Sequence, residues 1–261
     1  MIRRSGTVRR GAWLAAAVYL AVPCAPGRAA EIEVLGFLSL RPILAELAPA
    51  FERATGNRLA PAYDSVNFMR SRIAAGEAAD VMIASRSALD DLARRDRIAA
   101  GSIVDLARIT IRLFVRAGTP KPDIGSIAAL RRTLLNAQSI AFTDPARGAL
   151  AGRAFADALD RLGIADQLRP KSKSIQGLGS EGVAAVAAGA AAIGAAPTND
   201  LTPLPDGIDI VGPLPKELAS DVVISAGIVA NARAPEAAAA LIRFLASDAA
   251  ASAITAHGME R

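Results

Sequence analysis

Two hydrophobic patterns alternate along most of this chain. Short apolar runs are typical of buried strands, whereas longer runs repeat apolar residues every three or four positions, as at Ile43, Leu44, Leu47 and Phe51. The first pattern predicts strands over 32–35, 58–63, 80–84, 108–115, 139–142, 208–211 and 222–229. The second predicts helices over 40–54, 68–75, 88–95, 127–135, 153–162 and 181–191, with closing helices over 235–256. This alternation is typical of an α/β protein whose sheets are flanked by helices.

Two of the predicted strands suggest how the chain is divided. Segments 108–115 and 222–229 are long, and they enclose a central block of about a hundred residues. We expect the chain to cross to a second lobe at the first segment and to return at the second. The predicted division is 1–30 leader, 31–110 first lobe, 111–222 second lobe and 223–261 as the returning part of the first lobe.

The first thirty residues have the pattern of a secretory signal peptide. Four arginines stand among the first ten residues, an apolar run covers 12–22, and small residues surround Ala29 and Ala30. The apolar run is about half the ~20 residues that a membrane-spanning helix needs. We therefore predict cleavage near Ala29 or Ala30, a periplasmic location, and no membrane insertion once the leader is removed.

The leader also accounts for the net charge. The chain has 30 Lys and Arg against 25 Asp and Glu, and five of the arginines lie in residues 1–30, which contain no acid. The remaining residues are balanced at 25 basic and 25 acidic. The basic isoelectric point is thus no indication of nucleic-acid binding.

Residue types absent after the leader exclude several kinds of chemistry. The single Cys lies in the leader, so a disulfide or a catalytic thiolate is excluded. The single His is His257, near the C-terminus, so zinc sites built from His and Cys are excluded and a Ser-His-Asp triad would depend on that residue. We expect no cofactor.

One arrangement recurs at four predicted strand ends: a loop of small or polar residues followed by a helix. Helix N-termini present backbone N–H groups and the positive end of the helix dipole, which favours an anion. Ligands of open α/β sheets bind at the carboxyl ends of strands. The alternative for Ser39, Ser65 and Ser180 is an ordinary helix cap. The four loops, at 36–39, 64–67, 143–152 and 177–180, together predict a cleft for a small anion.

Residues 177–182 match the pattern G-x-G-x-x-G, with Asp200 at a tolerable distance beyond it. A dinucleotide site requires an apolar strand directly before the first glycine, and segment 171–176 is polar instead. An anion-binding loop is the favoured interpretation.

Single side chains add further candidates. Arg147, in an Asp-Pro turn, could bind a ligand carboxylate through two hydrogen bonds, or it could be a solvated loop residue. Tyr63 lies next to Asp64 at a strand end, and the favoured alternative for it is a partly buried core aromatic.

At these loops the chain resembles the periplasmic molybdate-binding proteins of ABC transporters. The resemblance covers nearly the whole chain after the leader. It implies the type 2 periplasmic binding protein fold, with two lobes, each a mixed sheet flanked by helices, and a ligand cleft between them. The stretches that carry it are Val-Leu-Gly-Phe-Leu-Ser-Leu (34–40), Phe-Glu-Arg-Ala-Thr-Gly (51–56), Ile-Ala-Ala-Gly-Glu-Ala-Ala-Asp-Val (73–81) and Thr-Asp-Pro through Ala-Gly (143–152).

The resemblance also implies ligand-binding positions. The serine of the first loop falls on Ser39, and the serine of the second falls on Val66, with Ser65 beside it. The backbone amide donors of the family fall on Ala151 and Gly179. The family's tyrosine falls near Pro197, which offers neither a hydroxyl group nor an amide hydrogen.

The chain is also similar to the aconitate isomerase branch of the same superfamily, in its length, its leader and the segment Glu-Leu-Ala-Pro-Ala-Phe-Glu-Arg-Ala-Thr-Gly. That branch moves an allylic double bond by proton abstraction and needs no cofactor. The candidate acid/base groups here would be Tyr63, Asp64, Asp144 or a lysine, with Arg41 and Arg147 binding carboxylates.

We therefore expect a monomeric periplasmic solute-binding protein that carries a small anion, molybdate-like or carboxylate, to an inner-membrane ABC permease. The alternative is an isomerase that interconverts cis- and trans-aconitate on the same scaffold.

Overall fold

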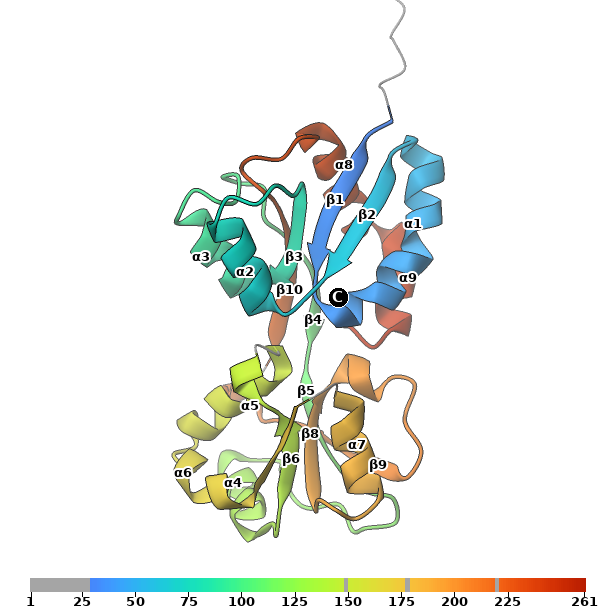
Figure 1. The fold of residues 1–261 in the computed structure, drawn as a ribbon. Coiled ribbons are helices and arrows are strands. Elements are labelled where there is room, and N and C mark those ends of the chain that lie inside the picture. The colour runs from blue at the N-terminus through green and yellow to red at the C-terminus, as the bar shows by residue number, and fades with distance from the viewer. Residues whose placement is uncertain (1–28, 148–149, 177–178, 219–220) are drawn as a thin grey trace, which may run out of the picture.

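The protein has two lobes, one above the other in Figure 1, with the strands β4 and β5 passing between them. This computed structural model describes residues 29–147, 150–176, 179–218 and 221–261. Each lobe contains one five-stranded sheet. The predicted α/β class is confirmed, and the predicted leader lies outside the described residues, apart from Ala29 and Ala30.

The first lobe is built from both ends of the described chain. Its sheet has the order β2-β1-β3-β10-β4, in which β1 runs parallel to β2 and β3 while β10 is antiparallel to β3 and β4. Its strands are β1 (Glu31–Gly36), β2 (Arg58–Tyr63), β3 (Val81–Ser85), β4 (Val104–Ile109) and β10 (Val222–Ile228). Its helices are η1 (Leu38–Leu40), α1 (Arg41–Thr55), α2 (Val66–Ala74), α3 (Arg86–Ala93), α8 (Pro235–Leu245) and α9 (Asp248–Ala256).

The second lobe comes from the middle of the chain. Its sheet has the order β7-β6-β8-β5-β9, in which β6 is parallel to β7 and β8 while β5 is antiparallel to β8 and β9. Its strands are β5 (Ile111–Arg116), β6 (Ile140–Thr143), β7 (Ser172–Ile175), β8 (Ile193–Pro197) and β9 (Ile208–Pro213). Its helices are α4 (Ile127–Asn136), η2 (Pro145–Arg147), α5 (Leu150–Arg161), α6 (Ala165–Leu168), η3 (Arg169–Lys171), α7 (Gly179–Ala187), η4 (Thr198–Leu201) and η5 (Lys216–Leu218).

The two sheets repeat one topology. In each, three parallel strands are followed by an antiparallel strand that comes from elsewhere in the sequence, β10 in the first sheet and β5 in the second. In Figure 1, β1 and β2 run toward the second lobe, so their carboxyl ends lie at the junction between the lobes. This is the position where open α/β sheets bind ligands.

The chain crosses between the lobes at Thr110, which is buried between β4 and β5. The C-terminal Glu260 pairs with Arg108 of β4 through two backbone hydrogen bonds. Its carboxylate accepts hydrogen bonds from Thr110 Oγ1 (3.5 Å) and Arg112 Nη2 (3.4 Å). One residue near the C-terminus therefore contacts both lobes at the crossing.

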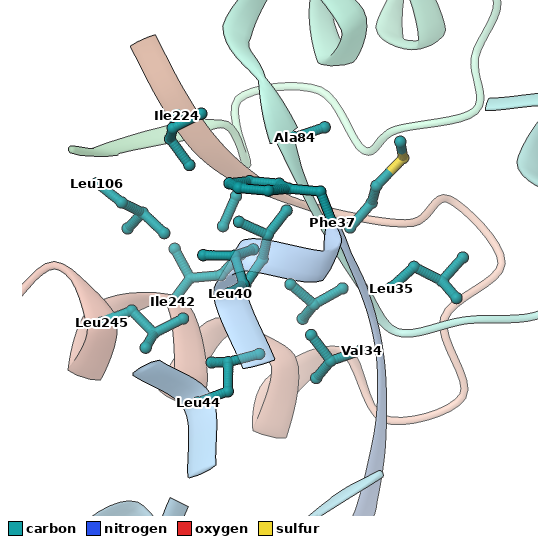
Figure 2. Packing of buried hydrophobic residues seen from close by; sticks show 14 of the residues in the cluster. Val34, Leu35, Phe37, Leu40, Leu44, Ala84, Leu106, Ile224, Ile242 and Leu245 are labelled. Atoms are coloured by element: carbon teal, nitrogen blue, oxygen red, sulfur yellow. The ribbon is translucent and has the colours of Figure 1, made fainter. Parts of the chain in front are cut away.

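Each lobe has its own hydrophobic core. In the first, α1 buries Ile43, Leu44, Leu47 and Phe51 as predicted, and ends at Gly56, whose φ of 73° suits glycine. Figure 2 shows that Phe37, from the loop after β1, lies among this core with Leu40, Ala84 and Ile224. Burial of the Phe37 ring anchors the loop that carries Ser39.

The core of the second lobe shares no buried residue with that of the first. One contact in it explains why position 194 is glycine. A Cβ added at Gly194 of β8 would lie 2.1 Å from the ring of Phe114, which is fully buried on β5. Only glycine therefore lets β8 and β5 pair while the Phe114 ring packs across them.

The two closing helices pack into the first lobe rather than standing apart. Ala238, Leu241, Ile242 and Leu245 of α8 are buried, as is Ile254 of α9. No single helix among the described residues is long and apolar enough to cross a membrane, whereas α8 and α9 meet that test only as a pair bent by 64°.

A buried carboxylate fastens the returning chain to the first sheet. Asp80, directly before β3, is 3% exposed. Its Oδ2 accepts a hydrogen bond from the backbone N–H of Glu33 in β1 (2.8 Å). Its Oδ1 accepts from the backbone N–H groups of Arg233 (2.8 Å) and Ala234 (2.9 Å), directly before α8. Asp80 thus joins β1, β3 and the start of α8.

Three details differ from the expectations. Segment 108–115, predicted as one extended strand, is two strands in different sheets, because the chain changes lobes at Thr110. The polar segment before the glycine motif forms the strand β7, which is tolerated because β7 lies at an edge of its sheet. Helix α5 begins at Leu150, three residues before the predicted start.

We predict that Asp80→Ala lowers the free energy of unfolding by about 3 kcal/mol or more, because it leaves three backbone N–H groups without their charged acceptor. Asp80→Asn should cost less, since its amide oxygen can still accept hydrogen bonds. Urea unfolding followed by circular dichroism measures both.

Asp206→Ala is the control for this experiment, because Asp206 is an exposed carboxylate of the second lobe and its loss should change stability by no more than about 0.5 kcal/mol. Equal unfolding midpoints for Asp80→Ala and Asp206→Ala would contradict the role given to Asp80.

Candidate functional site

The ends of β1 and β2 bring the first two predicted loops together. Gly36 is paired with Tyr63, and the backbone N–H of Asp64 donates to the carbonyl oxygen of Gly36 (3.0 Å). A Cβ added at Gly36 would lie 3.1 Å from Leu40 Cδ1, so glycine allows a close approach here. The loops that carry Ser39 and Ser65 therefore leave neighbouring strands side by side.

Ser39 stands in the short helix η1 and is half-buried. It caps no helix, and its hydroxyl has no hydrogen-bond partner within the described part of the chain. The neighbouring Leu38 is 48% exposed, whereas Phe37 is buried in the core. The loop thus presents a hydroxyl group next to an apolar side chain, on an anchored backbone.

Ser65 is a helix cap, as its alternative interpretation proposed. Its hydroxyl accepts a hydrogen bond from the backbone N–H of Phe68 (3.3 Å) at the start of α2. Val66 is buried in the core of the first lobe, so its side chain cannot take the place of a ligand-binding hydroxyl. Asp64 Oδ1 accepts from the backbone N–H of Ser65 (2.7 Å).

Tyr63 packs against the core of the first lobe and is half-buried, as the alternative for it predicted. The guanidinium of Arg41 lies 5.2 Å from the centre of its ring, a cation–π distance. Burial raises the pKa of the Tyr63 phenol, while Arg41 acts in the opposite direction. The phenol therefore keeps its proton at neutral pH, and it suits hydrogen-bond donation better than proton abstraction.

The end of β3 supplies a fifth loop that the sequence interpretation missed. Ser85 accepts a hydrogen bond from the backbone N–H of Ala88 (3.4 Å), and its hydroxyl lies 3.3 Å from that of Ser87. The sequence pattern that could have identified this loop is the one found at the other loops: a buried strand that ends in serine directly before a helix.

This fifth loop borders a cavity of about 660 Å³ that spans both lobes. Its three arginines are already engaged. Arg86 pairs with Asp90 and Asp105 at 3.0 Å each, and Arg153 pairs with Asp157 at 3.8 Å. Arg161 donates to the carbonyl oxygen of Leu218 (2.7 Å). The lining residues are Ser85, Arg86, Ser87 and Asp90 from the first lobe, Leu150, Arg153, Ala154, Asp157, Arg161 and Leu218 from the second, and Asp221, Val222 and Val223 from the returning chain.

In the second lobe, Asp144 joins the ends of β6 and β7. Its Oδ1 accepts from the backbone N–H of Ala146 (2.8 Å), and its Oδ2 accepts from Gln176 Nε2 (3.0 Å). Arg147 ends η2, and its side chain lies outside what the structure describes. The structure thus places Asp144 as a loop-shaping residue and leaves the proposed role of Arg147 a prediction.

Helix α5 begins at the junction between the lobes. Leu150, its first residue, packs against the core of the first lobe although it belongs to the second. Ala151 follows, half-buried. A Cβ added at Gly152 would lie 2.2 Å from the carbonyl oxygen of Thr143, so glycine is required for α5 to start this close to β6.

The first residue of α7, Gly179, lies against the carboxyl group of Asp200, which we did not select as a site residue from the sequence. Gly177 and Leu178 lie outside the described residues, and α7 begins at Gly179. A Cβ added at Gly179 would lie 1.9 Å from Oδ2 of Asp200, which belongs to η4 directly beyond β8. Burial raises the pKa of Asp200 to about 6. Pro197 ends β8 and has no N–H to offer.

The described residues contain no group of three or more His, Cys, Asp or Glu side chains placed to hold a metal ion. Strand ends and helix starts from both lobes meet at the junction, and the segments next to them carry Ser39, Ser65 and Ser85 in the first lobe and Asp144 and Asp200 in the second.

Residues 32–260 match the sequence profile of a family described as bacterial extracellular solute-binding protein. An aconitate isomerase from Pseudomonas sp. is 36% identical over 266 residues, which cover 100% of this chain and 98% of that protein.

Among solved structures, the substrate-binding domain of a putative molybdenum ABC transporter from Clostridium difficile has a TM-score of 0.73 at 18% identity, over 89% of this chain and 99% of that one. The periplasmic molybdate-binding protein of Azotobacter vinelandii has a TM-score of 0.66 at 20% identity, over 88% and 99%. At these identities the two structures show a shared fold.

The pKa of Asp200 predicts how stability depends on pH. An acid whose pKa is raised from 3.8 to about 6 on folding costs stability as pH rises through this range, and the cost is constant above it. Asp200→Asn should therefore raise the free energy of unfolding at pH 8 by at most about 3 kcal/mol and leave it unchanged near pH 4.

Urea unfolding at pH 4, 6 and 8 measures the effect, with Asp206→Asn as the exposed control that should show no such trend. A difference between Asp200→Asn and the wild type that does not grow from pH 4 to pH 8 would show that Asp200 has an ordinary pKa.

Proposed function

Because the chain belongs to the bacterial extracellular solute-binding protein family, we propose that it binds a small organic carboxylate in the cleft between its lobes. The observation that carries this proposal is the meeting of strand ends and helix N-termini from both lobes at one junction. Backbone N–H groups at helix starts stabilise negative charge without any metal ion or cationic side chain.

The proposed donors come from both lobes. Ser39 and Ser65 contribute hydroxyl groups, and the backbone at Val66, Ala151 and Gly179 contributes N–H groups. Arg147 would pair with a carboxylate of the ligand. A ligand held by both lobes favours the closed arrangement, which is the hinge closure of periplasmic binding proteins.

Two observations on this chain and one comparison favour a carboxylate over a tetrahedral oxyanion. The position expected to give a second hydroxyl is Val66, which is buried in the core of the first lobe. The position expected to close the oxyanion pocket is near Pro197, which has no donor. A planar carboxylate needs fewer donors around each charged group than a tetrahedral dianion does. The Pseudomonas relative at 36% identity also carries the name of an enzyme whose substrate is a tricarboxylate.

The remaining parts of the proposal concern the setting. The protein would be exported by its leader, cleaved near Ala29 or Ala30, and work in the periplasm as a monomer that delivers its ligand to an ABC permease. The lobes would be divided at 31–110, 111–222 and 223–261, which the change of sheet at Thr110 supports.

We predict that trans-aconitate and related tricarboxylates stabilise the purified mature protein in thermal-shift and calorimetric titrations more than molybdate or sulfate does. Ser39→Ala should weaken tricarboxylate binding about tenfold or more, because a hydrogen bond to a charged group is lost.

The matched pair for this test is Ser65→Ala and Ser126→Ala. Both serines cap a helix, Ser65 at α2 and Ser126 at α4, and only Ser65 belongs to the proposed ligand site. Each change should cost about 1 kcal/mol of stability, and only Ser65→Ala should also weaken binding. Failure of every anion in the panel to bind, or equal loss of binding in both variants, would contradict the proposed site.

A second function is favoured by one observation, the full-length match to an aconitate isomerase. In that reaction a base removes a proton from the allylic methylene carbon of aconitate, the double bond shifts by one carbon, and a proton is returned at the other end. No electron or atom is exchanged with a cofactor. Tyr63, Asp64 and Asp144 remain the candidate acid/base groups, and the two hydrogen bonds accepted by Asp144 suit it least to take a proton.

For this second function we predict that the wild-type protein incorporates deuterium from D₂O into aconitate and interconverts its cis and trans forms, followed by NMR and ultraviolet absorbance. Tyr63→Phe removes the phenol but keeps the aromatic ring beside Arg41. If the phenol donates a proton in the reaction, this change should lower kcat by at least tenfold. A complete lack of deuterium exchange at high protein concentration would exclude the isomerase and leave the binding function.

A further inference from the structure

We propose that Asp200 determines the specificity of the cleft by sharing a proton with a carboxylate of the bound ligand. It thereby selects polycarboxylates over oxyanions that are too weakly basic to share a proton. This inference rests on the proposed function, and it names the class of ligand that the second lobe accepts.

The position of Asp200 is the first argument. Asp200 lies in η4, directly beyond β8, and its carboxyl group is pressed against the first residue of α7, Gly179. Any side chain at position 179 would meet Oδ2 at 1.9 Å. The start of α7 is one of the helix N-termini that we assign to the ligand, so the acid and the ligand occupy the same end of the same helix.

The second argument is that one carboxylate oxygen of Asp200, Oδ2, lacks a hydrogen-bond donor among the described residues. Asn199 Nδ2 donates to its Oδ1 (2.9 Å). Its Oδ2 accepts no hydrogen bond from any described residue, and no described Lys or Arg forms an ion pair with it. A partly buried carboxylate oxygen without a donor is costly, and the cost is removed when the group holds a proton or when a ligand supplies one.

The two residues before Asp200 also have side-chain oxygens without hydrogen-bond partners among the described residues. Thr198 is 6% exposed, and its Oγ1 is buried without a partner among the described residues. The Oδ1 of Asn199 is also buried and likewise unpaired in the described chain. Thr198 and Asn199, directly beyond β8, therefore each carry a buried oxygen that the described residues do not satisfy, and ordered water or a ligand completes the hydrogen bonding at such places.

Neighbouring charges are not the cause of the raised pKa of Asp200. Glu181 lies in the first turn of α7, and the pair Arg112 and Glu260 lies by the crossing strand β5 and the C-terminus. Burial is the cause that raises the pKa of Asp200 to about 6. The acid can therefore gain or lose a proton near neutral pH.

These observations together determine which ligands the site tolerates. Two negative charges at one helix end repel each other, so a ligand anion and Asp200 cannot both stay ionised without a cost. A polycarboxylate whose last carboxyl group titrates near pH 6 can share one proton with Asp200. Molybdate and sulfate are weaker bases than such a carboxylate, so a proton taken up on their binding stays on Asp200 and is not shared with the anion.

Isothermal titration with trans-aconitate and with molybdate, from pH 5.5 to pH 8 and in two buffers of different ionisation enthalpy, measures affinity and proton uptake. For the wild type we expect uptake of about one proton per trans-aconitate at pH 7.5, and about a tenfold loss of affinity per pH unit above 6. Asp200→Asn should take up about one proton fewer, and its preference for trans-aconitate over molybdate should fall at least tenfold.

Asp206→Asn is the control, because this exposed carboxylate belongs to the same lobe and should leave the wild-type values unchanged. Equal proton uptake by Asp200→Asn and the wild type would overturn the inference. Wild-type binding without proton uptake at pH 7.5 would overturn it as well, and this result needs no variant to fold. If neither probe binds to any of the proteins, the proposed function fails and the inference fails with it.

Discussion

The hydrogen bonds that Asp80 accepts hold together the part of the molecule on which the rest depends. The first sheet is complete only when β10, from the far end of the chain, lies between β3 and β4. Asp80 directly precedes β3, which pairs with β10. It accepts hydrogen bonds from the backbone of β1 and of the segment before α8. Because the returning chain is fixed here, β10 completes the sheet from which β4 leads to the second lobe. The cleft exists because two such closed lobes meet at the carboxyl ends of their strands.

Much of this fold could be predicted from the sequence, because its signals are local. The apolar face and the terminal Gly56 define α1 almost to the residue, and the segment predicted for β2 is the strand observed. The predictions were wrong where a non-local partner decides the outcome. Thr110 divides the segment 108–115 into two strands because the chain enters a second sheet there. The polar segment of β7 is a strand because its backbone pairs with β6.

The candidate site shows the same division between local and non-local information. The loops at Ser39 and Ser65 could be predicted, because a strand followed by serine and a helix is a local pattern. Asp200 could not be selected, since its importance comes from contact with Gly179, twenty-one residues earlier in the sequence. The buried Val66 shows the reverse, because a position that a family resemblance assigns to the ligand can be taken over by the core.

The place of β10 between β3 and β4 also determines the order in which the two lobes can form while the chain is made. The second sheet has all its strands once Pro213 has been synthesised. The first sheet lacks a central strand until Ile228 has followed, and its Asp80 lacks two of its three donors until Ala234 is present. The first sheet is therefore completed only when nearly the whole polypeptide has been made, and β1 stays without its finished sheet through most of translation. An export system that accepts unfolded chains is served by this delay.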